Sequence, residues 1–416
     1  MRWNASLPMA PEAVPSAEAA RPPRTPSTGR LIGLDLARGL AILGMFAAHV
    51  GPGPSVGGPL GWVMEVARGR SSALFAVLAG FSLILLTGRP EPRTGLAGRQ
   101  AVVGVVVRSG VLIALGYALT WVDTDVDVIL AQFGVLFVLA LPLRRLRAST
   151  LVLVAASAAL VMPLVVFGLR AAVDGGSWAD SVIAHDPLAR VTGSDGLVEL
   201  FITGAYPVPT WLPFVVAGMA VAKLDLGRPG VLPRVALCGG ALAVLGYGGS
   251  WLALHLVPGA LTGVNAASGT TAAASAWWSD AVGEHPVPGM PAWLLVAAPH
   301  SQTTWSVLGN AGVALVVLAL CVMATDRSAQ LRWAATPVIA LGSVALTAYV
   351  GHILAIRALD VVEPPYSADL PVLLLFAVAA MAAALAWARA FRRGPLEYLI
   401  HAATTAATVT REGRPG

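Results

Sequence analysis

Arg38 and His49, in the first long apolar stretch of the chain, suit phosphate binding and proton transfer. They lie eleven residues apart, which in a helix is about three turns on one face and about 16 Å along the axis. Arginine is always charged and binds phosphate through two parallel hydrogen bonds, whereas histidine exchanges a proton near neutral pH. A long, phosphate-bearing thiol donor could span that gap. The structural alternative stays open: Asp35 pairs with Arg38, and His49 only caps a helix end.

Four arginines remain at apolar depth once the loop arginines are assigned: Arg38, Arg68, Arg70 and Arg108. A charge inside a bilayer is costly unless it is paired or hydrated, so such residues are candidates for function. Glu65 lies three positions before Arg68 and could neutralise it, but Arg70 has no acidic residue three or four positions away. Arg70 therefore needs a partner on another helix or an anionic ligand. We assign donor binding to four residues: Arg38, Arg68, Arg70 and Ser71.

Further histidines could serve an active site near the end of the helix that carries His49. His300 follows Pro299, and His352 follows Gly351; a lone histidine is more often structural, so both readings are kept. We predict that His49 and His300 are catalytic, and we assign substrate contacts to Asp35, Tyr206, Tyr349 and His352. Two isolated cysteines make neither a disulfide framework nor a metal site, and we expect no metal.

The composition predicts the kind of scaffold that holds these residues. Of 416 residues, 56% are hydrophobic and 12% are charged, whereas a soluble chain carries roughly a quarter charged residues. The apolar residues form runs near the length that a helix needs to cross about 30 Å of hydrocarbon. Because backbone amides in lipid must pair internally, these runs predict helices. We expect an all-α integral membrane protein with about ten transmembrane helices.

The apolar runs place the spans at ten positions: 31–50, 60–87, 100–121, 126–143, 149–169, 207–223, 233–256, 304–324, 334–357 and 370–391. Alternate connections gather the basic residues, at 89–99, 144–147, 223–234, 327–332 and 392–393. The other connections are acidic or neutral, and two of them, 170–206 and 257–303, are long. By the positive-inside rule, both termini are cytoplasmic and the protein lies in the plasma membrane. Loops of this length are usually functional, so the polar chemistry should face outward.

The domain organisation follows from the same runs. Residues 1–29 are rich in Pro, Ala, Ser and Arg without apolar periodicity, so we predict a disordered tail. A single transmembrane domain spans 30–403, and 404–416 form a second disordered tail. No cleavage site follows the first apolar run, which we therefore interpret as a retained span. The net charge of +5 is spread over short loops, which argues against nucleic acid as a partner.

A family resemblance enters through the first two spans. Ten residues separate Arg38 from His49, and Phe-Ala-Val-Leu-Ala-Gly-Phe follows at 75–81. This pattern resembles the bacterial membrane proteins named for the catalytic domain of heparan-α-glucosaminide N-acetyltransferase, whose relatives include the YeiB-like proteins. The resemblance continues over further segments, at 30–44, 128–137, 204–207, 300–301, 342–349 and 394–397.

The resemblance implies acyl transfer across the membrane. The co-substrate would be acetyl-CoA or another acyl-CoA entering from the cytoplasm, and the acceptor an amino or hydroxyl group of an extracytoplasmic sugar or glycolipid. His49 matches the motif histidine of the wider superfamily, either as a base for direct transfer or as the site of an acyl-histidine intermediate. The alternative function is a transporter or lipid-handling protein for an anionic substrate. Membrane lipids are expected partners, and a homo-oligomer is left open.

Overall fold

The computed structural model describes residues 28–409 apart from 90, 123, 125, 194, 284–288 and 362–369. Every regular element among these residues is helical, and no strand occurs in them. The predicted all-α class is therefore confirmed. Most of both predicted tails, 1–27 and 410–416, lies outside the described residues. The last helix continues to Val409, six residues past the predicted domain boundary, because its Ala- and Thr-rich end contains neither proline nor glycine.

Eighteen α-helices follow one another in the described part of the chain. They are α1 Thr28–Val50, α2 Gly58–Ala67, α3 Arg70–Thr87, α4 Gly95–Thr120, α5 Leu130–Ala140, α6 Ala148–Asp174, α7 Trp178–His185, α8 Pro187–Thr192, α9 Val208–Ala222, α10 Val231–Ala243, α11 Gly249–Leu256, α12 Ala260–Ser268, α13 Thr304–Arg327, α14 Ala329–Ala334, α15 Thr336–Ser343, α16 Ala345–Ala358, α17 Leu370–Ala390 and α18 Pro395–Val409. A π-helical turn, Val244–Gly248, joins α10 to α11.

Seven helical stretches of the described chain are long and apolar enough to cross a membrane: Ile32–Val50, Gly58–Thr87, Gly95–Thr120, Ala148–Asp174, Val231–Leu256, Thr304–Arg327 and Leu370–Ala390. An eighth span is formed if α15 and α16 count as one, although they meet at a bend of 88°. The protein is thus a multi-pass membrane protein, as predicted.

The remaining two predicted spans coincide with shorter helices. The helix α9 has 15 residues and α5 has 11, which at 1.5 Å per residue is less than the thickness of the hydrocarbon layer. The count of ten spans and the cytoplasmic termini therefore stay predictions. Prediction missed the sharp break at 343–344, because hydropathy averaged over 334–357 does not report backbone direction.

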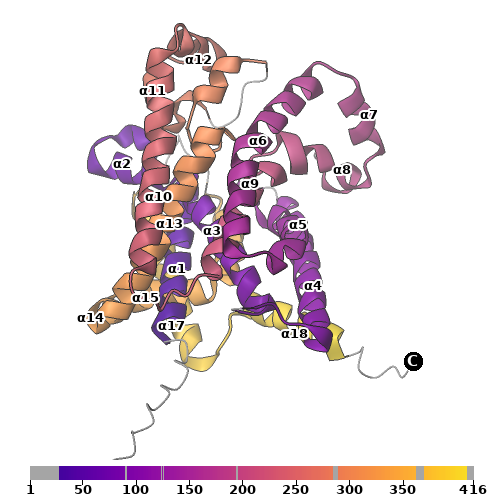
Figure 1. Ribbon diagram of the computed structural model, residues 1–416, viewed down its shortest axis with the longest axis vertical. Helices are drawn as coiled ribbons and strands as arrows, with labels where there is room; N and C mark the ends of the chain where they lie inside the picture. The colour runs from indigo at the N-terminus through magenta and orange to yellow at the C-terminus, as the bar shows by residue number, and fades with distance from the viewer. Residues whose placement is uncertain are drawn as a thin grey trace, which may run out of the picture.

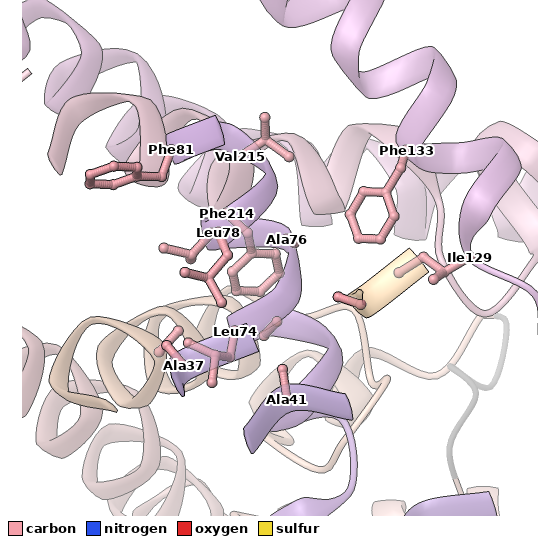
Figure 2. Close-up of a cluster of buried hydrophobic side chains, with 14 of the residues drawn as sticks. Ala37, Ala41, Leu74, Ala76, Leu78, Phe81, Ile129, Phe133, Phe214 and Val215 are labelled. Carbon is pink, nitrogen blue, oxygen red and sulfur yellow. The ribbon is translucent and has the colours of Figure 1, made fainter. Parts of the chain in front are cut away.

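Close helix packing builds the centre of the molecule. A Cβ atom placed on Gly80 of α3 or Gly218 of α9 would overlap the backbone of the facing helix, so glycine at both positions lets the two helices touch. Figure 2 shows the buried side chains around this crossing, including Phe214 and Val215. In membranes, small residues at helix crossings stabilise the contact through dispersion. The crossing fixes the position of α3, which carries several candidate site residues.

The connections sort to the two ends of the bundle. In Figure 1, α7 and α8 of the first long connection and α12 of the second lie toward the top, while α14 and α18 lie at the bottom. The two long connections therefore share one end of the molecule. We refer to it as the outer end, in keeping with the orientation predicted from charge.

Candidate functional site

A pair of histidines lies at the outer end of α1. Nδ1 of His49 and Nε2 of His352 are 2.9 Å apart, and the two rings stack with centroids 5.2 Å apart and an interplanar angle of 9°. A hydrogen bond between two imidazole nitrogens requires a proton on one and a lone pair on the other. The pair can therefore accept a proton at one ring and pass one on through the other.

The packing around His352 holds the pair in place. The side chain of His352 is 4% exposed, with Phe46 at 4.9 Å and Tyr349 at 5.2 Å between ring centroids. The hydroxyl of Tyr349 accepts a hydrogen bond from the backbone N–H of Ile129 at 3.3 Å. Nδ1 of His352 has no hydrogen-bond partner in the described part of the chain. A buried polar atom of this kind calls for a ligand or a functional role.

His300 lies in a strained loop that precedes α13. His300 and Gln302 both have positive φ, 56° and 58°, a conformation that side chains other than glycine rarely adopt. The amide of Gln302 donates to the Ala205 carbonyl at 2.7 Å and its Oε1 accepts from the Thr210 hydroxyl at 2.7 Å. The strain is thus held by buried hydrogen bonds, as is typical of binding sites.

The loop presents unsatisfied polar atoms next to aromatic rings. Nδ1 of His300 and Oγ of Ser301 are buried without a partner among the described residues. The ring of Tyr206 meets His300 edge-on at 5.2 Å, and Trp211 stacks at 6.2 Å. Tyr206 therefore contacts one of the two predicted catalytic histidines, and the aromatic rings fix the orientation of the imidazole.

The turn between α2 and α3 joins this loop to the histidine pair. Gly69, with φ of 64°, approaches Pro299 so closely that an added Cβ would lie 2.9 Å from the Pro299 Cβ. Arg68 next to it donates to Asp280 Oδ2 at 2.6 Å. His300 lies beside the same turn, since the added Cβ at Gly69 would be 3.7 Å from its Cδ2, and Arg68 and His300 both lie near enough to His49 for their charges to influence it. The structure thus brings His49, His300 and Arg68 into one outer site, together with His352.

Arg70 is buried and bonded within the protein. Its guanidinium donates to the hydroxyl of Tyr247 at 3.0 Å, and to the carbonyls of Glu65 at 2.9 Å and Trp278 at 2.6 Å. Tyr247 lies in the π-helical turn and donates in turn to Asn310 at 2.7 Å. The sequence left two kinds of partner open for Arg70, a residue of another helix or an anionic ligand. The structure shows partners within the protein, among them Tyr247 beyond α10. Irregular turns of this kind frequently mark functional sites.

Arg38 belongs to a second, separate group. Its guanidinium donates to Asp35 at 2.7 Å and to Ser82 Oγ at 2.7 Å. Ser82 lies twelve residues beyond Arg70 in α3, which is about 18 Å along the axis. The structure therefore does not bring the arginines of the predicted donor site together. Ser71 lies between the groups, where it donates to the Ala67 carbonyl and touches the backbone of Gly44 in α1.

A cavity of about 310 Å³ opens beside Arg38 at the inner side of the bundle. Its polar lining consists of Arg38, Ser82, Arg108, Ser343 and Glu397, set among apolar side chains. Arg108 makes no hydrogen bond or ion pair to the described residues. This volume is within the usual range for small-molecule sites, and two guanidinium groups favour an anionic ligand.

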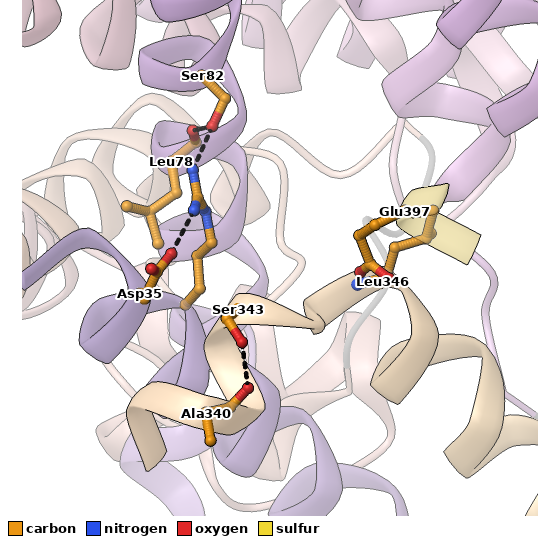
Figure 3. Close-up of polar contacts among 8 residues, drawn as sticks. Asp35, Leu78, Ser82, Ala340, Ser343, Leu346 and Glu397 are labelled. Atoms are coloured by element: carbon orange, nitrogen blue, oxygen red, sulfur yellow. Dashed lines mark hydrogen bonds and ion pairs between the residues drawn. The ribbon is translucent and has the colours of Figure 1, made fainter. Parts of the chain in front are cut away.

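Glu397 closes one side of this inner cavity. Its carboxylate accepts hydrogen bonds from the backbone N–H of Leu346 at 2.8 Å and of Thr347 at 3.2 Å, and from the Thr347 hydroxyl at 2.6 Å. These groups form the N-terminus of α16, just after the bend, and Figure 3 shows Glu397 beside Leu346. A carboxylate at a helix N-terminus is stabilised by the helix dipole. Glu397 of α18 therefore stabilises the bend between α15 and α16.

Two further polar residues of the site were not predicted. Arg170, 6% exposed at the outer end of α6, donates to the carbonyls of Ile202, Thr203 and Gly204 at 2.7–2.8 Å. Gly204 is two positions from Tyr206, so Arg170 supports the segment that contacts His300. The sequence signal for it is a charge at the end of an apolar run. Gln302 gives no such signal, because its role depends on the fold of the loop.

Comparison with known proteins finds a family that the last third of the chain resembles. Residues 281–407 match the family described as protein of unknown function, DUF418, which is associated with YeiB-like membrane proteins. The matched part includes His300, His352 and Glu397, whereas His49 and Arg38 precede it. No curated protein matches the chain. Among the described residues, no group of three or more His, Cys, Asp or Glu side chains could hold a metal ion.

Proposed function

We propose that this membrane protein is an acyltransferase that moves an acyl group, expected to be acetyl, from cytoplasmic acyl-CoA to an amino or hydroxyl group of an extracytoplasmic sugar or glycolipid. The observation that carries the proposal is the His49–His352 hydrogen bond of 2.9 Å in an apolar interior. Two imidazoles that share one proton form a base that can be reset after each turnover. A purely structural histidine would not need a second titratable ring as its partner.

The inner cavity supplies the donor side of the proposal. Acyl-CoA, when bound, provides a thioester carbonyl and several phosphates, and the two arginines of the cavity, Arg38 and Arg108, fit those phosphates. Arg108 can turn to a phosphate because it makes no hydrogen bond or ion pair with the described residues, although the Glu397 carboxylate lines the same cavity. Arg38 and His49 lie on the same helix about 16 Å apart along its axis. A donor held at the inner end can thus extend toward the outer histidines.

At the outer end, the histidine pair takes the proton of the acceptor as the acceptor attacks the thioester. Arg68, fixed by Asp280, contributes positive charge where negative charge develops. Arg70 holds the outer wall through Tyr247 and the two carbonyls rather than facing the donor. Direct transfer and an acyl-histidine intermediate both remain compatible with this arrangement, and trapping of labelled acyl on the protein without acceptor separates them.

Binding of acetyl-CoA by the purified protein tests the proposal. We expect Arg108→Ala to weaken binding by about tenfold, since a charged hydrogen bond to a phosphate contributes on the order of 1.4 kcal/mol or more. Arg38→Gln should act in the same direction. The control is Arg327→Ala, which removes an exposed arginine at the inner end of α13, outside the cavity. Absence of any acyl-CoA binding to the native protein would overturn the proposal.

A transporter is the second candidate, and the bend between α15 and α16 favours it. Discontinuous helices at membrane depth form the substrate sites of many transporters, and residues on both sides of this bend line the inner cavity. The two functions differ in their products. Release of free thiol from acyl-CoA by protein in detergent supports the enzyme, while uptake of an anion into sealed vesicles without thiol release supports the transporter.

A further inference from the structure

A second cavity, about 410 Å³ in volume, runs between α16 and α17. Apolar side chains form nearly all of its lining, and its walls include Phe46, Gly351, His352, Leu375, Ala380 and Trp387. We call it the slot. No arginine, lysine or carboxylate of the described residues lines it. Its ligand should therefore be predominantly hydrocarbon, in contrast to the ligand of the arginine-lined inner cavity.

The dimensions of the slot match a chain that lies along the membrane normal. Leu375 and Trp387 are twelve residues apart in α17 and both line the slot, so it extends for about 18 Å along that helix. One leaflet of the hydrocarbon layer is about 15 Å deep. Alanines line much of the α17 side, which leaves a smooth wall without large side chains. Such a surface accommodates a single extended alkyl chain.

One end of the slot opens to the lipid. Leu359 and Leu375 line it and are each 63% exposed, and α17 is one of the candidate membrane-spanning helices. A chain can therefore enter sideways from the bilayer. The inner cavity lies across the break between α15 and α16, where Gly342 and Ser343 line it. Donor phosphates held by Arg38 and Arg108 would thus lie in a different cavity from the lipid chain.

One residue that lines the slot carries a polar atom without a hydrogen-bond partner in the described chain. Of the polar side chains of the slot, Thr347 is already bonded to Glu397 and Trp387 donates to the Arg393 carbonyl. His352 bonds His49 through Nε2, but its Nδ1 is buried and unpartnered in the described chain. A ligand with a long alkyl tail and one hydroxyl or amino group could pack its tail against the apolar walls and form a hydrogen bond with Nδ1 of His352.

We propose that the slot binds the aliphatic tail of a membrane lipid, and that this lipid is the acyl acceptor, with its hydroxyl or amino group at Nδ1 of His352. This inference rests on the proposed function. The acceptor proton passes to Nδ1 of His352, while the proton on Nε2 is shared with His49. The acceptor oxygen or nitrogen forms a bond to the thioester carbonyl carbon, the carbon–sulfur bond breaks, and the thiolate of coenzyme A leaves and takes up the proton.

Gly351 gives a variant that fills the slot without disturbing the protein. A Cβ at Gly351 meets nothing within 4 Å, and the same is true of Gly110 in α4, which lies outside the slot. Gly351→Leu should therefore occupy the space of the lipid tail, and Gly110→Leu is its matched control. Both are glycine-to-leucine changes in exposed helix interiors, so neither should lower helix stability.

The experiment uses the full chain in vesicles of phosphatidylethanolamine and phosphatidylglycerol that contain a long-chain fatty alcohol with a diazirine in its chain. In the native protein we expect light to attach the label to α16 and α17. In Gly351→Leu the amount of labelling should be about tenfold lower, because overfilling such a site costs on the order of 1.4 kcal/mol or more. Gly110→Leu should label normally. With acyl-CoA added, Gly351→Leu should also form about tenfold less acylated alcohol than the native protein, and Gly110→Leu should form a normal amount.

Different results overturn different parts. Equal labelling of the two variants, or labelling confined to other helices, overturns the lipid site. Normal transfer to a water-soluble glucosamine by Gly351→Leu, with no acylated alcohol from the native protein, overturns the lipid as acceptor. Slot labelling with no acyl transfer to any acceptor overturns the acyltransferase function itself and leaves the protein a lipid-binding one.

Discussion

His49 and His352 lie 303 positions apart in the chain, yet Nδ1 of the first and Nε2 of the second share a hydrogen bond of 2.9 Å. The bond joins the end of α1 to α16, the second half of a broken helix. It couples the titration of the two imidazoles, since neither ring can change its protonation without affecting the other. Removing either ring should therefore have nearly the same effect as removing both.

The first prediction tests this coupling by a double-mutant cycle. We expect His49→Ala and His352→Ala each to lower acyl transfer by about 10²- to 10⁴-fold, the usual contribution of a positioned base. The double variant should be hardly slower than either single one, because groups that act as a unit are not additive. Thiol release from acyl-CoA measures the rates. His185→Ala, which removes an exposed histidine of α7, is the control, and losses that multiply in the double variant would show two independent rings.

The helices could be predicted because each apolar run is local, whereas the site depends on how distant helices align. Arg38 and His49 share a helix, so their separation followed from their spacing in the sequence. Arg68 could equally have paired with the nearby Glu65, but its partner is Asp280, 212 positions away. Nothing in the sequence fixes how far α3 is shifted along α1. That shift separates Arg38 from Arg70, and no local pattern reports it.

The bend between α15 and α16 shows the same limit. A Cβ at Gly342 would overlap the backbone of Asp35 in α1, so the chain must pass α1 closely at this point. The hydropathy of 334–357 is that of a continuous span, and the break becomes visible only with Glu397 at the new helix N-terminus. Glu397 was part of the family resemblance, but its contact with Leu346 could not be deduced from it.

The second prediction concerns the charge of Glu397. Glu397→Gln keeps an oxygen that can accept from Leu346 and Thr347, but it removes a negative charge from the cavity of Arg38 and Arg108. We expect a slightly lower Tm, since a charge at a helix N-terminus contributes about 0.3–1 kcal/mol. Coenzyme A should bind more tightly, by up to about tenfold at low salt, and the gain should shrink as salt screens the charges.

Calorimetric titration with coenzyme A and thermal unfolding in detergent measure both effects. Asp326→Asn is the matched control, because it removes an exposed acidic residue at the inner end of α13, outside the cavity. It should leave the affinity unchanged. If Glu397→Gln binds coenzyme A more weakly, the main role of this carboxylate is to hold the cavity in shape. Its negative charge would then not be what weakens the binding of an anion.

The third prediction compares two glycines with positive φ. Gly69 and Gly57 have φ of 64° and 69°, but an added Cβ meets Pro299 only at Gly69 and nothing within 4 Å at Gly57. Both alanine variants should lose about 1–3 kcal/mol from backbone strain. Gly69→Ala should lose about 1–3 kcal/mol more through overpacking, and it should displace His300. The Tm and the rate of thiol release should therefore be lower in Gly69→Ala than in Gly57→Ala. Equal losses in the two variants would exclude the close approach of Gly69 to Pro299.

The fourth prediction concerns Arg170, which positions the outer site without touching it. Arg170→Met leaves the carbonyls of Ile202, Thr203 and Gly204 without their donor, at a cost of about 1–3 kcal/mol. The segment before Tyr206 should loosen, so that the edge of the Tyr206 ring no longer fixes His300. We expect kcat to fall with little change in the KM for acyl-CoA, because the donor cavity lies at the other end of the molecule.

Arg170→Lys should recover part of kcat, since an ammonium group can reach one or two of the three carbonyls but cannot reproduce the planar fork of arginine. Arg190→Met is the control: Arg190 is exposed and, among the described residues, donates only to the carbonyl of Ala184, so its loss should leave kcat and the Tm near those of the native protein. A rise in the KM for acyl-CoA with unchanged kcat in Arg170→Met would contradict a role at the histidines. It would instead tie the 199–204 segment to donor binding through α6 and α9, the two helices against which this segment packs.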